Sequence, residues 1–466
     1  MKIKDLKGKK ITVMGLGLLG GGLAVVRFLH EAGARVIVTD IKSKEDLVPS
    51  IEKLKDLKNI EYVLGQHRVE DFVKVDMIVK NPAARWDNKY IKLALENNVP
   101  VEIDSSLFFK LCKNTIVGVT GTKGKTTTSS LIYEILKTAG KNVVKVGIDK
   151  ISVLDKLKEL KKDSIVVFEL SSWRLSALGM YGISPHVAVF TNIYPDHLNY
   201  YKTLAGYIGD KKFIFSSQKV TDFCIINSDD RALQKMISEI KSQIIKFSRE
   251  KIERGRSVYM DEEKIYLNNG IDEKRIVDIS EIKLKGQHNW GNIMASIGAT
   301  YVLDIKVESM RKAILNFVKA PSQRLEFIRE FEGIQYYNDT AATTPESALL
   351  GINSFEEPII LICGGADKNL DMSELAKTIC ERVKGVIFLK GEASDKIISE
   401  MNNLFCDAEK KRFPIVESMK KAVEVARSVA EPGDVILLSP GAASFGIFVN
   451  EFDRGEKFVK EVKSLK

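Results

Sequence analysis

Short runs of apolar, mostly β-branched residues alternate along the chain with longer amphipathic stretches. A short continuous apolar run is typical of a strand buried on both faces, and the stretches between the runs have the spacing of helices. The alternation predicts an α/β protein with mostly parallel sheets that helices cover on both faces. The predicted strands are 11–14, 36–39, 77–79, 116–119, 165–170, 187–192, 359–363, 386–389 and 435–438.

Three blocks of this pattern follow one another, each long enough to bury a core of its own. The first block, residues 1–111, opens with a strand and a glycine-rich turn. The second, residues 112–319, opens with another strand and a second glycine-containing turn. Pro321 and a change of pattern mark the start of the third block, residues 320–466. We therefore expect three domains.

The composition is that of an ordinary globular protein, with 44% hydrophobic and 29% charged residues. No apolar run approaches the roughly 20 residues needed to cross a bilayer, and the basic N-terminus lacks the apolar segment of a signal peptide. We therefore expect a cytoplasmic protein with no membrane partner. The cysteines are odd in number and widely spaced, so we expect reduced core residues rather than disulfides or a zinc site. They are Cys112, Cys224, Cys363, Cys380 and Cys406.

The chain has 71 Lys and Arg against 62 Asp and Glu, a formal net charge of +9. Such a balance favours an anionic partner. The basic residues are scattered, however, and no basic block interleaves with aromatic residues as a nucleic-acid site requires. We therefore expect phosphorylated small molecules as ligands and no nucleic acid.

The first block carries the turn Gly15–Gly20 (Gly-Leu-Gly-Leu-Leu-Gly) directly after its first strand, and Asp40 ends the next strand. In the dinucleotide-binding fingerprint, such glycines let the backbone approach a pyrophosphate, and the acid contacts a polar group of the ribose or base. The motif alone leaves three interpretations open. They are a nicotinamide-dependent dehydrogenase, a site for another nucleotide, and a structural turn.

The second block carries Thr120–Thr128 (Thr-Gly-Thr-Lys-Gly-Lys-Thr-Thr-Thr), which leads into a predicted helix, 129–137. It is a variant phosphate loop, because the strict pattern has glycine where Val119 stands. N–H groups at a helix N-terminus bind phosphate, Lys125 can reach the β- and γ-phosphates, and Thr126 can ligate Mg²⁺. We expect a nucleoside triphosphate site here rather than a turn without a ligand.

Further polar groups follow two predicted strands of the second block. Glu169 lies at the end of strand 165–170, and Asp196 and His197 follow strand 187–192. The carboxyl ends of parallel strands meet at the edge of the sheet where α/β folds bind ligands. Each residue alone is more typical of a helix cap or a solvated side chain. Beside a phosphate loop, the carboxylate and the imidazole together predict a metal site.

Taken together, the motifs resemble those of the Mur ligases, the ATP-dependent ligases of peptidoglycan precursor synthesis, over nearly the whole chain. The resemblance is greatest to the branch that adds D-glutamate. The motifs are Gly-Leu-Gly at 15–17, Thr-Gly-Thr-Lys-Gly-Lys-Thr at 120–126, Glu-Leu-Ser-Ser at 169–172, Asp-His at 196–197, Gly-Gln-His-Asn-Trp-Gly-Asn at 286–292, Arg324, Asn-Asp at 338–339, Gly-Gly-Ala-Asp-Lys at 364–368 and Leu-Ser-Pro-Gly-Ala-Ala-Ser at 438–444.

The resemblance implies a Rossmann-like N-terminal domain for a UDP-sugar, a central P-loop-type ATPase domain and a Rossmann-like C-terminal domain. It implies an amide ligase that adds D-glutamate to UDP-N-acetylmuramoyl-L-alanine through an acyl phosphate and releases ADP and phosphate. Charge neutralisation and positioning dominate such chemistry, because an anionic carboxylate must approach an anionic triphosphate. The dehydrogenase interpretation then falls away. The partners implied are small molecules, and we expect a monomer.

The resemblance also implies roles for individual residues. The catalytic set is Lys125, Glu169, His197, Lys211, Arg324 and Asp339. The ATP contacts are Gly121, Thr122, Lys123, Gly124, Lys125, Thr126, Thr127, Asn289, Asn292 and Arg324. The UDP contacts are Gly15, Leu16, Gly17, Leu18, Leu19 and Asp40, and the contacts of the incoming amino acid are Thr343, Lys368, Ser444 and Phe452. The metal ligands are Thr126, Glu169, His197 and Lys211.

Lys211, in Tyr207–Lys211 (Tyr-Ile-Gly-Asp-Lys), matches the lysine that Mur ligases carry as a carbamate. A neutral amine that captures CO₂ becomes an anion able to hold Mg²⁺, whereas an ammonium would repel the ion. From the residues alone we would expect a solvated helix lysine beside Lys212. The resemblance implies ATP, two Mg²⁺ ions and the carbamate at Lys211 as cofactors.

The chain departs from the D-glutamate pattern at several positions. Where that pattern has Asn-Asp-Ser-Lys-Ala-Thr, residues 338–343 are Asn-Asp-Thr-Ala-Ala-Thr, so Ala341 replaces a lysine. Gln323 stands where histidine is usual, 147–150 read Gly-Ile-Asp-Lys instead of Gly-Asn-Ile-Gly, and 173–174 read Trp-Arg instead of Phe-Gln. The loss of a cation removes charge from a region that meets carboxylates and phosphate.

These departures keep three alternatives open. A related branch that adds L-glutamate to the same acceptor also lacks the lysine at the position of Ala341. Folylpolyglutamate synthases share the central domain and the ligation chemistry, but they lack the first block. A binding homologue without catalysis would explain Ala341 but not the retention of Lys125, Glu169 and Lys211.

Overall fold

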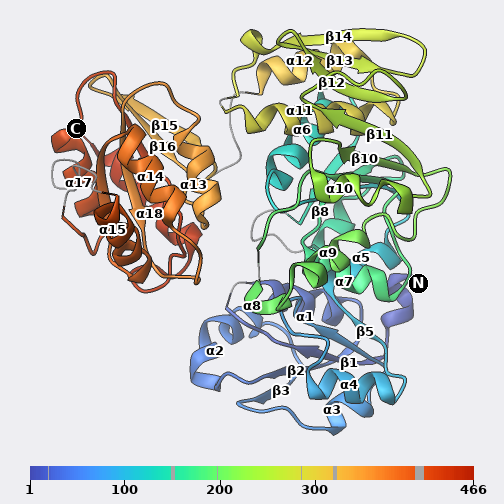
Figure 1. The fold of residues 1–466 in the computed structure, drawn as a ribbon. Coiled ribbons are helices and arrows are strands. Elements are labelled where there is room, and N and C mark those ends of the chain that lie inside the picture. Colours follow the sequence, from blue (N-terminus) through green and yellow to red (C-terminus); the bar gives the residue numbers. More distant parts are fainter. Residues whose placement is uncertain are drawn as a thin grey trace. The chain divides into compact units, whose positions relative to one another are not determined.

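The computed structural model describes residues 1–18, 20–147, 153–196, 198–284, 286–317, 323–404 and 414–465. Three sheets follow one another along the described chain (Figure 1). By compactness the chain divides into two units. The first, residues 1–279 with 291–314, contains the first two sheets, and the second, residues 280–290 with 315–466, contains the third.

The first sheet has parallel strands in the order β3-β2-β1-β4-β5. The strands are β1 (Lys10–Met14), β2 (Arg35–Asp40), β3 (Glu61–Leu64), β4 (Met77–Lys80) and β5 (Val101–Glu102). The helices are α1 (Gly21–Glu31), α2 (Lys44–Ile51), α3 (Glu70–Val73), α4 (Lys89–Glu96) and α5 (Asp104–Leu111). Apolar side chains of α1 pack on one face of the sheet and those of α3 and α4 on the other, and α5 packs against α7 (Ser172–Met180) and Phe168 of β8 (Ile165–Glu169). The loops after β1 and β4 flank the point where the strand order reverses, which is where such sheets bind ligands.

The second sheet has the order β14-β13-β12-β11-β10-β9-β6-β8-β7. Its strands are β6 (Thr115–Thr120), β7 (Val143–Val146), β8 (Ile165–Glu169), β9 (Val187–Phe190), β10 (Phe223–Asn227), β11 (Gln243–Ser248), β12 (Ser257–Asp261), β13 (Lys264–Asn268) and β14 (Glu273–Asp278). The helices are α6 (Lys125–Thr138), α7 (Ser172–Met180), α8 (Leu198–Tyr201), α9 (Leu204–Lys212), α10 (Arg231–Gln234), α11 (His288–Tyr301) and α12 (Val307–Asn316). β13 runs antiparallel to β12 and β14, and the other neighbours pair in parallel.

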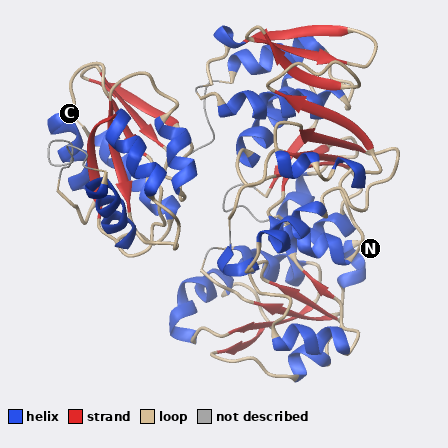
Figure 2. Ribbon diagram, viewed as in Figure 1, coloured by secondary structure: helices blue, strands red, loops and turns tan. Residues whose placement is uncertain are grey.

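The third sheet has the order β15-β16-β19-β17-β18, and only its edge pair, β15 with β16, is antiparallel. The strands are β15 (Glu326–Phe331), β16 (Ile334–Asn338), β17 (Ile359–Gly364), β18 (Val383–Leu389) and β19 (Val435–Leu438). The helices are α13 (Pro345–Ile352), α14 (Ser373–Arg382), α15 (Glu392–Asn403), α17 (Met419–Val429) and α18 (Glu451–Ser464). Helices α13, α14 and α15 cover one face, and α17 and α18 cover the other (Figure 2).

The predicted fold class is confirmed: the described chain has three α/β domains with mostly parallel sheets. Every predicted strand is present, although the strand predicted at 187–192 ends at Phe190 and β18 begins at Val383 rather than Val386. The helix predicted from Ser129 begins at Lys125. Ten strands of the described chain were not predicted: β3, β5, β7, β10, β11, β15, β16 and the meander β12–β14.

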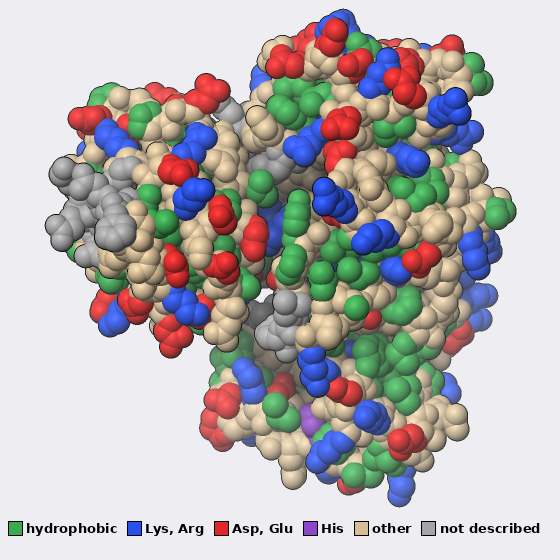
Figure 3. All heavy atoms as spheres, viewed as in Figure 1, with side chains coloured by type: hydrophobic (Ala, Val, Ile, Leu, Met, Phe, Trp, Pro, Cys, Tyr) green, Lys and Arg blue, Asp and Glu red, His purple; other side chains and the backbone are tan. Residues whose placement is uncertain are grey.

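Three predictions from composition can be compared with the structure. Cys112, Cys224 and Cys363 have free thiols. Cys380 is disulfide-bonded, so the expectation of reduced cysteines is wrong at this position, and Cys406 lies outside the described residues. Within the described ranges, every helix is too short or too polar to cross a lipid bilayer. On the face shown in Figure 3, basic side chains are interspersed with acidic ones, as the scattered sequence pattern predicts.

Candidate active site

The loop between β6 and α6 has the form of a phosphate-binding loop. Gly121 and Gly124 have φ angles of +150° and +81°, which side chains rarely adopt. A Cβ at Gly124 would lie 2.1 Å from Oδ1 of Asn292, so that position also has no room for one. Helix α6 begins at Lys125, immediately after the loop. The N–H groups of its first turn, which have no partner within the helix, therefore border the loop and suit an anion.

Lys125 and the end of β9 complete this loop. The Lys125 ammonium donates to the carbonyl oxygens of Gly121 at 3.1 Å and Thr122 at 3.0 Å, so it lies over the loop. Asn192, just after β9, accepts the Lys123 N–H through Oδ1 at 2.8 Å. Its own carbonyl accepts the N–H of Thr122 at 2.9 Å. The loop backbone is therefore held in shape by a neighbouring strand end, without help from a ligand.

Lys211 is buried beneath the loop, with 1% of its surface exposed. Its Nζ donates to the carbonyl oxygen of Gly121 at 2.8 Å and to Oγ1 of Thr120 at 3.4 Å, and lies 4.7 Å from the ring centroid of Tyr207. No described carboxylate forms an ion pair with it. Burial, and then the charge of Lys125, lower the pKa of Lys211 well below its usual value of 10.5. The site therefore favours the neutral amine.

The next residue in the sequence behaves in the opposite way. The ammonium of Lys212 pairs with Glu239 at 2.6 Å on the surface of the same helix end. The structure thus separates two adjacent lysines into one buried amine and one solvated ion pair. The expectation of a solvated lysine, drawn from the residues alone, applies to Lys212 and not to Lys211.

Glu169 ends β8 opposite Val119 of β6, so it lies at the edge of the sheet that carries the loop. Its Oε2 is buried and has no hydrogen-bond partner among the described residues. An orphaned buried carboxylate oxygen is costly unless a cation completes it. Thr126, on the first turn of α6, is the other predicted oxygen ligand within the described chain. These oxygen donors suit Mg²⁺.

His197 lies outside the described residues, so its predicted role as a metal ligand is not tested. Asp196, immediately before it, forms an ion pair with Lys123 at 3.7 Å. Among the described residues no group of three or more His, Cys, Asp or Glu side chains gathers as a metal site. The predicted ligand set differs in kind, because it includes a threonine and a modified lysine.

Two asparagines of α11 are buried one helical turn apart, Asn289 with 3% and Asn292 with 5% of its surface exposed. Oδ1 of Asn292 accepts a hydrogen bond from Oγ1 of Thr128 at 3.2 Å. Asn292 therefore joins α11 to α6 beside Gly124. Thr127, also predicted to contact ATP, lies on the first turn of α6 and is buried.

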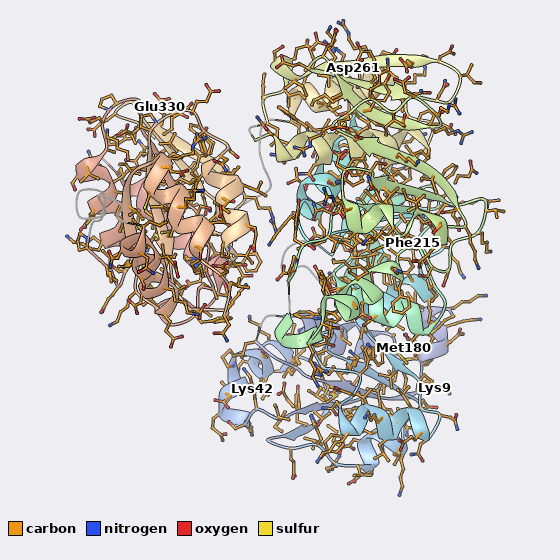
Figure 4. The ribbon with its side chains drawn as sticks, viewed as in Figure 1. Lys9, Lys42, Met180, Phe215, Asp261 and Glu330 are labelled. Carbon is orange, nitrogen blue, oxygen red and sulfur yellow. The ribbon has the colours of Figure 1, made fainter. Side chains whose placement is uncertain are left out.

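The first glycine loop follows β1, as predicted. Gly15 and Gly17 have φ angles of +94° and +59°. The Gly17 N–H donates to Oδ2 of Asp40 at 3.1 Å, and the N–H of Lys42 donates to Oδ1 at 3.0 Å; Lys42 is labelled in Figure 4. Asp40 therefore fixes the loop through both of its oxygens. Of the predicted UDP contacts, Leu16 is buried, Leu18 is exposed and Leu19 lies outside the described residues.

In the second unit, the loops that carry the predicted amino-acid contacts meet. Nζ of Lys368 donates to Oγ1 of Thr343 at 3.2 Å. Ala366 and Ala443 exchange backbone hydrogen bonds of 3.0 and 3.1 Å, which joins the loop of Lys368 to the loop of Ser444. Ser444 is buried. The structure thus brings the predicted cation and hydroxyls onto adjoining loops.

Phe452 and Asp339 belong to the same region of the second unit. Phe452 is 36% exposed, and its carbonyl accepts Nε2 of Gln323 at 3.4 Å. Oδ1 of Asp339 accepts the N–H of Leu325 at 3.2 Å, and Oδ2 accepts Oγ of Ser439 at 2.7 Å. Asp339 therefore anchors the start of β15, which Arg324 precedes in the sequence.

Sequence reasoning missed Arg454, the largest fully buried side chain of the described chain. Its Nε and Nη2 donate to Oγ1 and the carbonyl oxygen of Thr340, both at 2.9 Å, and its Nη1 donates to the carbonyl oxygen of Ala442 at 3.2 Å. It fastens the loop after β16 to the loop after β19. Burial lowers the pKa of Arg454 to about 10. Tyr207 and Asn192 were missed as well, because only the folded chain brings them to the phosphate loop.

Comparison with known proteins accounts for this assembly. Three family models match in succession: the Mur ligase MurD-like N-terminal domain at residues 9–102, the Mur ligase middle domain at 119–300 and the Mur ligase glutamate ligase domain at 323–441. The UDP-N-acetylmuramoylalanine–D-glutamate ligase of Roseiflexus sp. is 38% identical over 99% of this chain and 100% of its own length. The chain belongs to the Mur ligase family. Mur ligases are ATP-dependent enzymes that form amide bonds.

Other Mur ligases of the same name are similar over their whole length. The ligase of Borreliella afzelii is 38% identical, with 100% of both chains covered, and that of Clostridioides difficile is 36% identical, with 99% of this chain and 100% of its own covered. Among solved structures, MurC of Thermotoga maritima matches with a TM-score of 0.62 and 21% identity over 98% of this chain and 100% of its own. MurF of Thermotoga maritima in complex with ADP matches with a TM-score of 0.57 and 18% identity, over 99% of this chain and 97% of its own. At this identity the structural matches show the fold alone.

Proposed function

We propose that this Mur ligase forms an amide bond between the amine of D-glutamate and the carboxylate of UDP-N-acetylmuramoyl-L-alanine, with ATP as the energy source, in peptidoglycan precursor synthesis. The full-length relatives of that name support the substrates. The observation that carries the proposal is the arrangement at one edge of the second sheet, where a phosphate loop, the orphaned oxygen of Glu169 and the buried amine of Lys211 occur together.

Mg²⁺ fits the residues at this edge. The buried Oε2 of Glu169 needs a cation, and Thr126 offers a hydroxyl on the first turn of α6. We assign Thr126, Glu169, His197 and Lys211 to two Mg²⁺ ions. When bound, the ions neutralise charge on the phosphates and on the carboxylate that attacks them.

Lys211 suits a carbamate better than an ammonium. The lowered pKa supplies the neutral amine that reacts with CO₂, and Lys125 offers a cation to the carbamate oxygens. Formation joins the amine nitrogen to the carbon of CO₂ and releases one proton. The product is an anion in place of a neutral amine, and this anion can serve as a metal ligand.

The reaction then has two steps. A carboxylate oxygen of the acceptor attacks the γ-phosphorus of ATP, forms an acyl phosphate and releases ADP. The amine of glutamate attacks the acyl carbon, phosphate leaves, and the amine loses a proton. Lys125 holds the phosphates on the loop, and the buried Asn289 and Asn292 serve ATP with Gly121–Thr127. Arg324 and Asp339, which belong to the second unit, complete the assigned catalytic set with His197.

The UDP part of the acceptor and the incoming glutamate are assigned to different loops. Gly15–Leu19 receives the UDP part, and Asp40 acts there by shaping the loop, since both of its oxygens bind backbone N–H groups. Glutamate is assigned to Thr343, Lys368, Ser444 and Phe452. Lys368 beside the hydroxyl of Thr343 suits a carboxylate.

L-Glutamate is the second candidate, because Ala341 stands in the loop that leads to Thr343. The Ala341 N–H donates to the carbonyl oxygen of Gln323 at 3.0 Å, so the backbone is ordered although the cationic side chain of the D-glutamate pattern is absent. The stereochemistry of the amino acid is therefore the part of the proposal that most needs an experiment.

We place the domain boundaries at 111/112 and 319/320, with a UDP-sugar domain, an ATP domain and an amino-acid domain. The ranges of the three sheets and of the three family matches support these boundaries. The proposed substrates are small molecules of the cytoplasm, so we propose that location. We further propose a monomer without nucleic-acid or membrane partners.

The test is phosphate release from ATP and Mg²⁺ in the presence of UDP-N-acetylmuramoyl-L-alanine and a panel of D- and L-amino acids. We expect release with D-glutamate and none without the acceptor. Preference for L-glutamate would select the second candidate and keep the ligase. Release with a pteroate acceptor only, or with no combination of acceptor and amino acid, would overturn the proposal.

A further inference from the structure

The segment that follows β4, residues 80–87, contacts the first glycine loop at its start. The Asn81 N–H donates to the carbonyl oxygen of Met14, the last residue of β1, at 2.8 Å. A Cβ at Gly15 would lie 3.0 Å from Cβ of Asn81, so the two loops touch. The segment therefore lies directly beside the start of the glycine loop.

The segment has a shape of its own. Lys80 is buried, and its Nζ donates to the carbonyl oxygen of Ala84 at 2.7 Å and lies 4.2 Å from the ring centroid of Trp86. The Asn81 side chain accepts the N–H of Ala83 at 2.9 Å. These contacts fold the segment back between Lys80 and Trp86.

From there the segment reaches the second sheet's helices. Nε1 of Trp86 donates to Oγ of Ser176 on α7 at 2.8 Å. Nη1 of Arg85 donates to the carbonyl oxygen of Tyr200 on α8, and the Arg85 guanidinium lies 5.1 Å from the Tyr200 ring centroid. Asp87 pairs with the same guanidinium at 2.8 Å. Trp86 thus fixes the segment on α7, and Arg85 holds α8.

The contacts continue from α8 to the buried lysine. The rings of Tyr200 and Tyr201 lie 4.8 Å apart, and the hydroxyl of Tyr201 donates to Oδ2 of Asp210 at 2.8 Å. The rings of Tyr201 and Tyr207 lie 5.4 Å apart, and Nζ of Lys211 lies 4.7 Å from the Tyr207 ring. An unbroken row of packed side chains therefore joins Arg85 to the residue assigned as a metal ligand.

We propose that Arg85 is a positioning residue for the ligation reaction, which aligns the α8–α9 side of the ATP site with the domain that holds the UDP substrate. This rests on the proposed function. Arg85 acts on the ATP site through Tyr200, Tyr201 and Asp210. The acceptor carboxylate must meet the γ-phosphate in line, so a small displacement of α8 and α9 lowers the rate of phosphoryl transfer while each binding loop keeps its ligand.

The test compares wild type with Arg85→Ala, Arg85→Lys and Tyr201→Phe, by ADP release with ATP, UDP-N-acetylmuramoyl-L-alanine and glutamate. For Arg85→Ala we expect kcat to fall by about tenfold or more, because a displacement of this kind costs up to about a hundredfold. The KM values for ATP and for the UDP substrate should stay within about twofold, since the glycine loop and the phosphate loop are intact. Arg85→Lys keeps one donor for the Tyr200 carbonyl and should recover part of kcat, and Tyr201→Phe should show a smaller loss of the same kind.

The matched control is Lys74→Ala, which removes an exposed cation directly after α3 of the same domain, whose side chain forms no hydrogen bond or ion pair with a described residue. It should leave kcat unchanged. Arg85→Ala with wild-type kcat would overturn the inference, as would a loss of kcat accompanied by equal rises in both KM values or by a lower melting temperature. If wild type itself forms no amide, the proposed function fails; if wild type is active and the variants match it, only this inference fails.

Discussion

Replacement of Lys211 by methionine should stabilise the protein while it abolishes activity. Methionine has a similar length and fills the same buried space, but it carries no charge. The lysine has no carboxylate partner in the described chain, and burial lowers its pKa well below 10.5. If Lys211 contributed to stability, its replacement would destabilise the protein. If instead Lys211 is retained for the reaction although it destabilises the fold, its replacement should stabilise the protein.

The size and sign of this effect follow from the pKa. In the unfolded chain the lysine keeps its proton up to a pH near 10.5, whereas in the folded chain it loses the proton at a lower pH. Between these two values unfolding takes up a proton, so the stability of wild type rises with pH across that window. Each pH unit between the two values corresponds to about 1.4 kcal/mol. The advantage of Lys211→Met should therefore be greatest below the folded pKa and should vanish as the pH approaches the pKa of the free lysine.

The assay is urea unfolding of both proteins at pH 6, 8 and 10 in buffer freed of CO₂, repeated with bicarbonate and Mg²⁺. Bicarbonate should stabilise wild type only, because a ligand that binds the folded state alone raises its stability. Activity should be lost in Lys211→Met, and in Lys211→Ala short carboxylic acids should restore part of it by replacing the carbamate. If Lys211→Met were less stable than wild type at every pH, or if it kept full activity, the reasoning would be refuted.

Three further outcomes test the assigned sites. Lys125→Ala should abolish ATP turnover with an unchanged melting temperature, measured by ADP release and thermal unfolding, because its ammonium lies over the loop and outside the core. Gly124→Ala should weaken ATP binding by tenfold or more in calorimetry, since its Cβ would lie 2.1 Å from Asn292 at a φ of +81°; an unchanged affinity would exclude the loop as the phosphate site. Lys368→Ala should raise the KM for glutamate by about tenfold, the low end for a charge-assisted hydrogen bond because the side chain is exposed, and leave the KM for ATP unchanged; equal rises in both would contradict the assignment of Thr343 and Lys368 to glutamate.

The sequence predicted the parts of the fold that depend on local pattern. The apolar runs marked nine strands, among them the parallel strands β1, β6 and β8, and the two glycine turns lie after β1 and β6, but the parallel strands β10 and β11 were missed. The β12–β14 meander escaped, because an edge meander with polar alternate positions lacks the continuous apolar run of a buried strand. The start of α6 was missed because three successive threonines after Lys125 have low helix propensity, which the packing of the loop overrides.

For the candidate site, the sequence motifs predicted which residues take part but not what surrounds each side chain in the fold. Lys211 and Lys212 are identical in the sequence, and only the packing of α9 beneath Gly121 makes one of them a neutral amine. The contact of Asn292 with Gly124 joins residues far apart in the chain, so no local pattern could reveal it. Long-range contacts of this kind decide pKa and loop shape.

Arg454 has a consequence for how specificity evolves. Because its guanidinium binds the hydroxyl and carbonyl of Thr340 and the carbonyl of Ala442, a side chain of α18 joins the two loops, and the side chains of Ala341 and Thr343 take no part in these hydrogen bonds. Residues such as Ala341 and Thr343 can then be exchanged by mutation without moving the backbone that carries them. If this domain binds the amino acid as proposed, a change of amino-acid preference therefore needs few substitutions in these loops.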